Sequence, residues 1–416
     1  MSAAAIKGWC PDAWHPMMAG DGLLLRIRPR LGRMTAGQVL AMCEVALAHG
    51  NGQIDLTSRA NLQLRGFDAG NWEAAIGQLV DLGLVDPDPV METRRAVLVT
   101  PDWRTGDDTL RIAEALIARL DELPDLPGKM GFAIDAGDAP VLGEASADFR
   151  IERGQSGGLI LRADGRETGA PVVADGAVDA LITLAHWFID TGGIAARRMA
   201  RHNAELPNWA TGSEAPAPAG APLLPGEHAL GPVYGLPFGR IDASALAAAM
   251  TATGAQAVRI TPWRTILFEH GTEAPPLQGR GWGGASRPGP APRATGRAWG
   301  EAPPPAPPLK GRGEETVFIT DPADPALRVD ACPGAPACPA ATTETRDLAL
   351  QLAPLVSGRL HVSGCAKGCA HSGPADVVLT GRDGLFDLGF AARAGDPPAQ
   401  SGLTPAQILA HFESRR

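Results

Sequence analysis

Asp55-Leu-Thr-Ser-Arg-Ala-Asn-Leu-Gln-Leu-Arg65 predicts two short strands joined by a polar turn. Later in the chain, the stretch Ala257-Val-Arg-Ile-Thr-Pro-Trp-Arg-Thr-Ile-Leu-Phe268 repeats that order of strand, Thr-containing turn and strand. Two such stretches indicate an internal duplication, with chance similarity between common patterns as the alternative.

The segments before these stretches agree with a duplication. In the first copy Leu23–Arg28 alternates as a strand, and Thr35 can cap the apolar helix that follows. In the second copy Val233–Phe238 predicts a strand, and Asp242 can cap an Ala-rich helix that ends at Gly254. Each copy therefore predicts a small α+β module.

Length and composition describe a globular protein with more than one core. The chain has 416 residues, of which 44% are hydrophobic and 20% charged, with a net charge of −9. The negative charge argues against nucleic acid as the main partner. No stretch approaches the roughly 20 apolar residues that a membrane helix needs, so we expect a cytoplasmic protein that does not bind a membrane.

The basic residues are almost all arginines, because only four of the 37 are lysines. A GC-rich genome is one explanation for the total count. Arginine also presents a planar fork that suits carboxylates and phosphates better than lysine does. The places where arginines cluster therefore remain informative about a ligand.

Two segments predict no regular structure. Residues 211–225 are rich in Pro, Ala and Gly and predict a linker. Residues 274–313 are dominated by Pro and Gly and contain no Ile or Val. Such a segment cannot bury enough apolar surface to offset its ordering entropy, so we expect a disordered insert.

Four of the six cysteines form two pairs near the end of the chain. Cys332-Pro-Gly-Ala-Pro-Ala-Cys338 is followed by Ser363-Gly-Cys365-Ala-Lys-Gly-Cys369-Ala-His371. Four thiolates with small neighbours favour a 4Fe–4S cluster. Zinc is an alternative, although zinc ribbons prefer tighter Cys-x2-Cys knuckles, and unligated thiols are another. We expect His371 to be a neighbour of the cluster rather than a ligand.

These cysteine spacings resemble the cluster signature of the sirohaem sulfite and nitrite reductases. Residues 55–66 resemble the family's Thr-x-Arg-x-x-x-Gln segment, which lies against the tetrapyrrole, and Arg26-Ile-Arg28 resembles the strand before it. Glu92-Thr-Arg-Arg95 and Leu126-Pro-Gly-Lys-Met-Gly131 resemble the segments that place cations over the distal face. Within the family, the sequence resembles the precorrin-3B synthase branch most. That resemblance lies in Lys7-Gly-Trp-Cys-Pro and in residues 51–63, 126–135 and 331–338.

The resemblance implies an α+β fold with duplicated ferredoxin-like half-domains and two α/β cluster-type domains. The implied units are half-domain 1 (1–92), α/β domain 1 (93–210), the linker (211–225), half-domain 2 (226–273), the insert (274–313) and the cluster-binding α/β domain (314–416).

For function, the branch implies an oxygen-dependent hydroxylation of precorrin-3A at carbon 20, with γ-lactone formation, in aerobic cobalamin biosynthesis. The enzyme would be a monooxygenase with a 4Fe–4S cluster and a mononuclear non-haem iron. Dioxygen would be a substrate, and electrons would come from NADH through a donor protein or reductase. None of the nine histidines forms a recognisable iron-binding pattern, so we assign that iron no ligands.

The resemblance also implies roles for individual residues. The catalytic candidates are Lys129 and Arg95, and the substrate carboxylates would be bound by Arg26, Arg28, Arg59, Gln63, Arg65 and Arg94. Cys332, Cys338, Cys365 and Cys369 would hold the cluster.

Two positions depart from the reductases, and Ala96 departs from the pattern of the synthase branch as well. Gly131 stands where the reductases have a second distal lysine, and Ala96 replaces the usual Asn after Arg95. Fewer cations on the distal face weaken binding of a small anion. Two alternatives remain: a sirohaem-dependent assimilatory sulfite or nitrite reductase, and a non-catalytic protein with zinc on the four cysteines.

Overall fold

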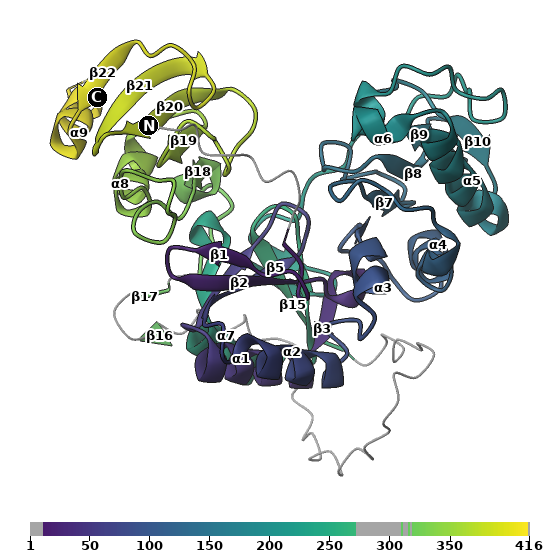
Figure 1. Cartoon of the computed structure of the whole chain (residues 1–416), viewed down its shortest axis with the longest axis horizontal. Coiled ribbons are helices and arrows are strands. Elements are labelled where there is room, and N and C mark those ends of the chain that lie inside the picture. The colour runs from purple at the N-terminus through teal and green to yellow at the C-terminus, as the bar shows by residue number, and fades with distance from the viewer. Residues whose placement is uncertain (1–10, 272–308, 311–314, 317, 415–416) are drawn as a thin grey trace.

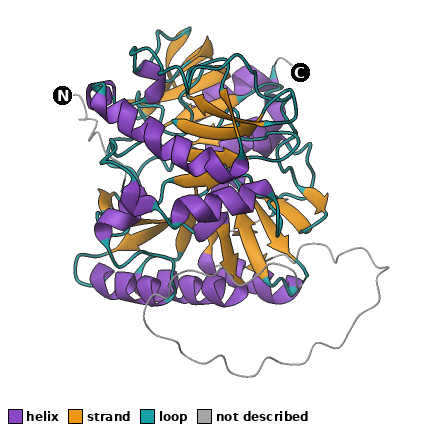
Figure 2. Ribbon diagram, turned by 90° about the vertical axis from the view of Figure 1, so that its right-hand side faces the viewer, coloured by secondary structure: helices purple, strands orange, loops and turns teal. Residues whose placement is uncertain are grey.

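The computed structural model describes residues 11–271, 309–310, 315–316 and 318–414. A central unit of two sheets carries two α/β domains (Figure 1). The helices α1 (Ala36–His49), α2 (Trp72–Asp81) and α7 (Ala243–Thr253) run along one side of the central sheets, and both α/β domains stand on the opposite side. Figure 2 shows the same layering from the side, with helices at the base.

The central unit is built from two copies of one module. The strands of the first copy are β1 (Met17–Ala19), β2 (Gly22–Ile27), β3 (Arg33–Thr35), β4 (Gln53–Leu56) and β5 (Leu62–Phe67). Those of the second are β11 (Gly226–His228), β12 (Gly231–Gly235), β13 (Arg240–Asp242), β14 (Ala257–Ile260) and β15 (Thr265–Glu269). The order of elements is the same in both, which agrees with a duplication.

The two copies exchange one strand each. The first sheet has the order β1-β2-β5-β4-β13, and the second has the order β11-β12-β15-β14-β3. Thus β13 of the second copy pairs with β4, while β3 of the first copy pairs with β14. Neither sheet is complete without the other copy, so the two copies form one folding unit.

Local sequence signals explain these elements. Thr35 and Gln38 form a capping box at the start of α1, and Asp242 accepts hydrogen bonds from two backbone N–H groups of α7. The predicted strand Val233–Phe238 is shorter in the structure, because a one-turn 3-10 helix at Pro237–Gly239 follows β12.

The first α/β domain follows the first copy. Its helices are α3 (Pro89–Arg94), α4 (Asp108–Ile117), α5 (Ala177–Asp190) and α6 (Gly193–Ala196). Its strands are β6 (Val97–Val99), β7 (Phe132–Asp135), β8 (Phe149–Arg153), β9 (Leu159–Ala163) and β10 (Ala170–Val172). Strands β6, β7 and β8 are parallel, and β9 and β10 return antiparallel.

The second α/β domain has the same topology. Its strands are β18 (Val329–Ala331), β19 (Leu360–Ser363), β20 (Ala375–Arg382), β21 (Leu385–Ala392) and β22 (Gln400–Leu403), with helices α8 (Arg346–Leu352) and α9 (Pro405–Glu413). The first three strands are parallel and the last two antiparallel. The predicted fold class is therefore confirmed.

The predicted connecting segments have different outcomes. Residues 211–225 join the first α/β domain to the second copy, but their first half is not unstructured: Glu214 and Ala217 make backbone hydrogen bonds to Gly169 and Arg153. Most of the predicted insert 274–313, and residues 1–10 with Lys7 and Cys10, lie outside the described residues. Only β16 (Leu309–Lys310) falls within the insert, and it pairs with β17 (Glu315–Thr316). In the described part of the chain, no helix is long and apolar enough to cross a membrane.

Candidate functional site

The first sheet presents a polar face toward the two α/β domains. The strand register places Arg26, Gln63, Asp55 and Arg240 in one row across β2, β5, β4 and β13. Residues directly opposite one another in antiparallel strands share a face. The neighbouring positions, such as Leu25, Leu62 and Ile54, are fully buried against the helices. The alternation of the strands thus separates an apolar core from a row of charged and polar groups.

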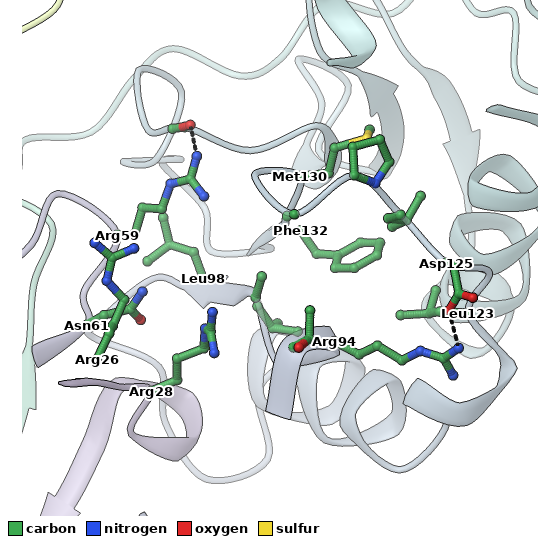
Figure 3. A pocket seen from close by; sticks show the side chains of 18 of the residues that line it. Arg26, Arg28, Arg59, Asn61, Arg94, Leu98, Leu123, Asp125, Met130 and Phe132 are labelled. Carbon is green, nitrogen blue, oxygen red and sulfur yellow. Dashed lines mark hydrogen bonds and ion pairs between the residues drawn. The ribbon is translucent and has the colours of Figure 1, made fainter. Parts of the chain in front are cut away.

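A pocket lies where this face meets the first α/β domain. Four of the predicted arginines line it: Arg26, Arg28, Arg59 and Arg94. Figure 3 shows Arg26, Arg28 and Arg59 along one side, with Leu123, Met130 and Phe132 along the other. The pocket therefore combines guanidinium groups with an apolar wall.

Two of these arginines are held by carboxylates. Arg28 is buried, and its Nη1 lies 3.0 Å from Oε1 of Glu92. Arg94 donates to Asp125 at 2.9 Å and to the carbonyl oxygens of Leu120 and Asp121. Both side chains are therefore fixed in orientation before any ligand arrives.

Arg59 has a neutral partner. Its Nη2 donates to Oγ of Ser146, which also lines the pocket, at 2.9 Å. A ligand carboxylate could replace this hydroxyl as the acceptor of the hydrogen bond from Arg59. Arg59 thus satisfies a simple requirement for a residue that binds an anionic ligand.

Of the eight predicted substrate-binding and catalytic residues, four are not among those that line the pocket. Gln63 is half-buried beside Arg26 in the sheet register, and Lys129 lies between the lining residues Gly128 and Met130. Arg95 donates to Glu92 at 2.9 Å and to the carbonyl oxygen of Arg28. These three residues thus lie behind or beside the pocket.

Arg65 is the fourth, and it is placed differently. Only 3% of it is exposed, and its guanidinium donates to both carboxylate oxygens of Asp21 at 2.7 and 2.8 Å and to Asp55 at 3.3 Å. Hydrogen bonds to these carboxylates outweigh the opposing effect of burial and raise its pKa. The geometry thus places Arg65 inside the protein rather than at a ligand rim.

Sequence reasoning did not single out several residues of the site. Glu92 is fully buried and holds both Arg28 and Arg95. Its place three residues before Arg95 on a helix was a usable signal. Asn61, Phe132 and Ser146 line the pocket, but nothing in their local sequence distinguishes them from ordinary turn or core residues.

The structure explains one departure from the reductases. A Cβ atom at Gly131 would lie 2.9 Å from the carbonyl oxygen of Ala96. That contact is closer than real Cβ atoms tolerate. A lysine at this position would therefore require the backbone around Ala96 to move.

The four clustered cysteines lie on two loops at one edge of the second α/β domain. Cys332 follows β18 directly, and Cys365 comes two residues after β19. These strands are parallel neighbours with Ala331 opposite Val362, so their carboxyl ends and the loops that follow them meet. The backbone N–H of Gly364 also lies 3.2 Å from the Sγ of Cys332.

The other three thiols of the group influence Cys369. Burial raises the pKa of the Cys369 thiol, and the charges of Cys365, Cys332 and Cys338 add to that effect. Four thiols on two adjoining loops, with a backbone N–H near one sulfur, are the donor set that a cubane cluster needs. However, among the residues that the structure describes, no three His, Cys, Asp or Glu side chains are arranged to hold a metal ion. The cluster therefore stays a prediction.

A buried polar group lies beside the cysteine loops. The predicted neighbour His371 packs edge-on against His361, with ring centroids 5.8 Å apart, and its Nδ1 lies 3.6 Å from Asp330. His361 is fully buried, and neither of its ring nitrogens has a hydrogen-bond partner in the described residues. Burial, together with the nearby charges of His371 and Arg264, lowers the pKa of His361 to about 4.

Comparison with known proteins shows what this fold and sequence resemble. Residues 15–82 match the nitrite/sulfite reductase ferredoxin-like half domain. The chain superposes on the structure of the Mycobacterium tuberculosis NirA protein with a TM-score of 0.56 and 16% identity, over 94% of this chain and 79% of that one. At this identity the likeness shows the fold alone. The fold is thus that of the nitrite and sulfite reductases.

A sequence relative narrows the resemblance. The chain is 29% identical to a precorrin-3B synthase from Sinorhizobium sp, over 95% of this chain and 85% of the relative. The predicted resemblance is therefore confirmed at both levels, to the nitrite and sulfite reductase family and, within it, to precorrin-3B synthase.

Proposed function

We propose that this protein is an oxidoreductase of cobalamin biosynthesis that hydroxylates precorrin-3A at carbon 20, with closure of a γ-lactone to give precorrin-3B. One atom of dioxygen enters the product and the other leaves as water, so the reaction takes two electrons from an external donor. NADH, acting through a donor protein or reductase, is the proposed source. The similarity to a precorrin-3B synthase over nearly the whole chain supports this proposal.

The arginine-lined pocket is the observation that carries the proposal. Precorrin-3A is a macrocycle with carboxylates around its rim, and guanidinium groups bind carboxylates in a bidentate manner. Arg26 and Arg59 would bind rim carboxylates, while Arg28 and Arg94 would add positive potential from fixed positions. The apolar wall at Phe132 and its neighbours would exclude water from one face of the macrocycle.

The contact between the cysteine-bearing loop and the first sheet supports redox chemistry on the sheet face that carries Arg26. The loop that carries Cys332 and Cys338 contacts the first sheet on its polar face, through Arg65 Nη2 and the carbonyl oxygen of Ala337 at 3.4 Å. Arg26 lies on the same face. When bound to the four cysteines, a 4Fe–4S cluster supplies electrons one at a time.

The remaining candidates have supporting roles in this proposal. Lys129, between the pocket-lining residues Gly128 and Met130, would steer oxygen or an intermediate. Arg95 would act through Arg28, whose carbonyl oxygen it holds, and through Glu92. Gln63 would be a neutral donor beside Arg26. No residues are proposed for a mononuclear iron.

The visible absorption spectrum of anaerobically purified protein tests the class of reaction. We expect a broad sulfur-to-iron band without sharp tetrapyrrole bands, because the macrocycle site would be open for substrate. Intense sirohaem bands would instead make the protein a small-anion reductase and would overturn the proposal. If the protein is colourless, zinc analysis with no labile sulfide would identify the non-catalytic alternative.

Product analysis tests the reaction itself. With precorrin-3A, a reductant and ¹⁸O-labelled dioxygen, we expect the product to gain one labelled oxygen atom, detected by mass spectrometry. Label entering from water instead of dioxygen would contradict a monooxygenase.

A further inference from the structure

Asp55 lies at a junction between the first sheet and the cysteine-bearing domain. It is 6% exposed, and its carboxylate meets three arginines from different elements: Arg65 of β5 at 3.3 Å, Arg240 of β13 at 3.4 Å and Arg346 of α8 at 3.2 Å. Burial acts to raise its pKa, but the positive charges of Arg346, Arg240 and Arg65 outweigh burial and lower it. Asp55 is therefore an anion buried among cations from two domains.

Arg346 depends on this contact. Its Nη2 donates to Asp55, while its Nε and Nη1 have no hydrogen-bond partner in the described residues. The neighbouring Thr345 donates its hydroxyl to the carbonyl oxygen of Cys332 at 2.6 Å. Arg346, which is held by Asp55, thus directly follows the residue that contacts the backbone of Cys332.

The other end of the cysteine loop is held by the same network. Arg65, which pairs with Asp55, also donates to the carbonyl oxygen of Ala337, directly before Cys338. The backbone N–H of Gly20 donates to that same oxygen at 2.9 Å. Both ends of the Cys332–Cys338 loop are therefore tied to the first sheet through partners of Asp55.

The second copy of the module has a matching network with reversed charges. Arg259 on β14 occupies the place of Asp55, two residues before the turn threonine, and Glu269 on β15 occupies the place of Arg65. Glu269 pairs with Arg259 at 2.9 Å and with Arg33 of β3 at 2.8 Å. Arg259 in turn donates to the carbonyl oxygen of Pro101 and lies 4.0 Å over the ring of Trp103, both in the first α/β domain.

The reversed charges make each central sheet selective for one α/β domain. An arginine at the start of α8 is attracted to Asp55, whereas it would be repelled by Arg259 in the other sheet. Conversely, the carbonyl oxygens that accept from Arg259 would face an unfavourable negative charge at Asp55. The two α/β domains have the same topology, so topology alone does not decide which sheet each domain packs against.

We propose that Asp55 is a positioning residue, which seats the cysteine-bearing domain on the first sheet and holds the Cys332–Cys338 loop against the polar face of that sheet. The proposal concerns the geometry of the loop, and only its consequence for electron transfer rests on the proposed function. Removal of the Asp55 charge frees Arg346 and loosens the loop without opening the central core.

Thiol alkylation of the full chain, reduced and freed of metal, tests this assignment independently of any cofactor. Alkylation rates are read for each cysteine-containing peptide by mass spectrometry. Cys43, which is 1% exposed in the central core, reports global opening, and Cys369, which is exposed, reports reagent activity. In Asp55→Asn we expect Cys332 and Cys338 to react about tenfold faster, the effect of losing one hydrogen bond to a charged group, while Cys43 and Cys369 are unchanged.

Further variants separate positioning from general destabilisation. Arg346→Gln should reproduce the effect, the double variant should add little to either single one, and Asp55→Glu should restore slow alkylation. Glu269→Gln, in the second sheet, is the matched control and should leave the alkylation of Cys332 slow. The assignment is wrong if Cys332 and Cys43 accelerate together, if Glu269→Gln acts as strongly as Asp55→Asn, or if neither Asp55→Asn nor Arg346→Gln changes Cys332.

Discussion

The two α/β domains share a strand order and the same change from parallel to antiparallel strands, yet they differ at one edge. In the second domain, cysteines follow the first two strands. In the first domain, the residues after the equivalent strands β6 and β7 are Thr100 and Ala136, which line an acidic hollow with Asp102 and Asp138. The fold supplies loops at the carboxyl ends of parallel strands, and the residues on those loops decide what chemistry they support.

The largest expected effect tests the chemical difference between these edges. Replacement of one cysteine, Cys365→Ser, should remove nearly all iron and acid-labile sulfide, because a cubane cluster needs all four thiolates. Metal and sulfide analysis of purified protein measures this. Cys43→Ala, in the central core, should retain both, and equal loss in the two variants would mean that the fold rather than the cluster had failed.

The next effect concerns how the first domain holds the pocket. Glu92 is fully buried and pairs with Arg28 and Arg95. Glu92→Gln should lower the free energy of unfolding by about 3 kcal/mol, because removal of one partner leaves buried charges uncompensated. Urea denaturation measures this. The exposed Glu167→Gln should change stability by no more than about 0.5 kcal/mol.

Acid should affect the two domains in opposite directions. Burial raises the pKa of Asp135, at the end of β7, to about 6. Because this folded-state pKa lies above the unfolded value, protonated Asp135 stabilises the fold. That stability is fully present below about pH 4 and is lost as pH rises through 6. His361, with its pKa lowered to about 4, contributes stability above about pH 6.5 that is lost as pH falls toward 4.

Hydrogen exchange at several pH values, corrected for intrinsic rates, measures both effects. Between pH 6 and pH 4 we expect the protection of β7 to rise and that of β19 to fall, each by about 2 kcal/mol at most. Asp135→Asn should abolish the first change and leave the second. Parallel behaviour of the two domains would contradict this assignment of the titrating groups.

The smallest effect sharpens the assignment of the pocket. Arg59→Ala should weaken binding of a polycarboxylate tetrapyrrole such as uroporphyrin about tenfold, the contribution of one charged hydrogen-bond partner. Fluorescence quenching measures the affinity. Arg111→Ala removes an exposed arginine that pairs with Asp108 and Asp175, and it should have no effect. Equal weakening in both variants would indicate non-specific attraction.

Local signals predicted much of this molecule. The caps at Thr35 and Asp242, the turns at Thr57 and Thr261 and the duplicated order of elements follow from short-range chemistry, and the structure has them. The exchange of β3 and β13 between sheets was not predictable in this way. Both are three-residue strands, and their pairing depends on contacts between residues about two hundred positions apart.

The candidate site divides in the same manner. The sequence alone determined which residue types are present: four clustered cysteines with cluster-like spacing, and arginines in motifs that resemble those of a tetrapyrrole-binding family. Only the tertiary structure decided that Arg26 and Arg59 line a pocket while Arg65 is buried against Asp21 and Asp55. The physical reason is that an arginine's role depends on its nearest carboxylates, and folding brings those from distant parts of the chain.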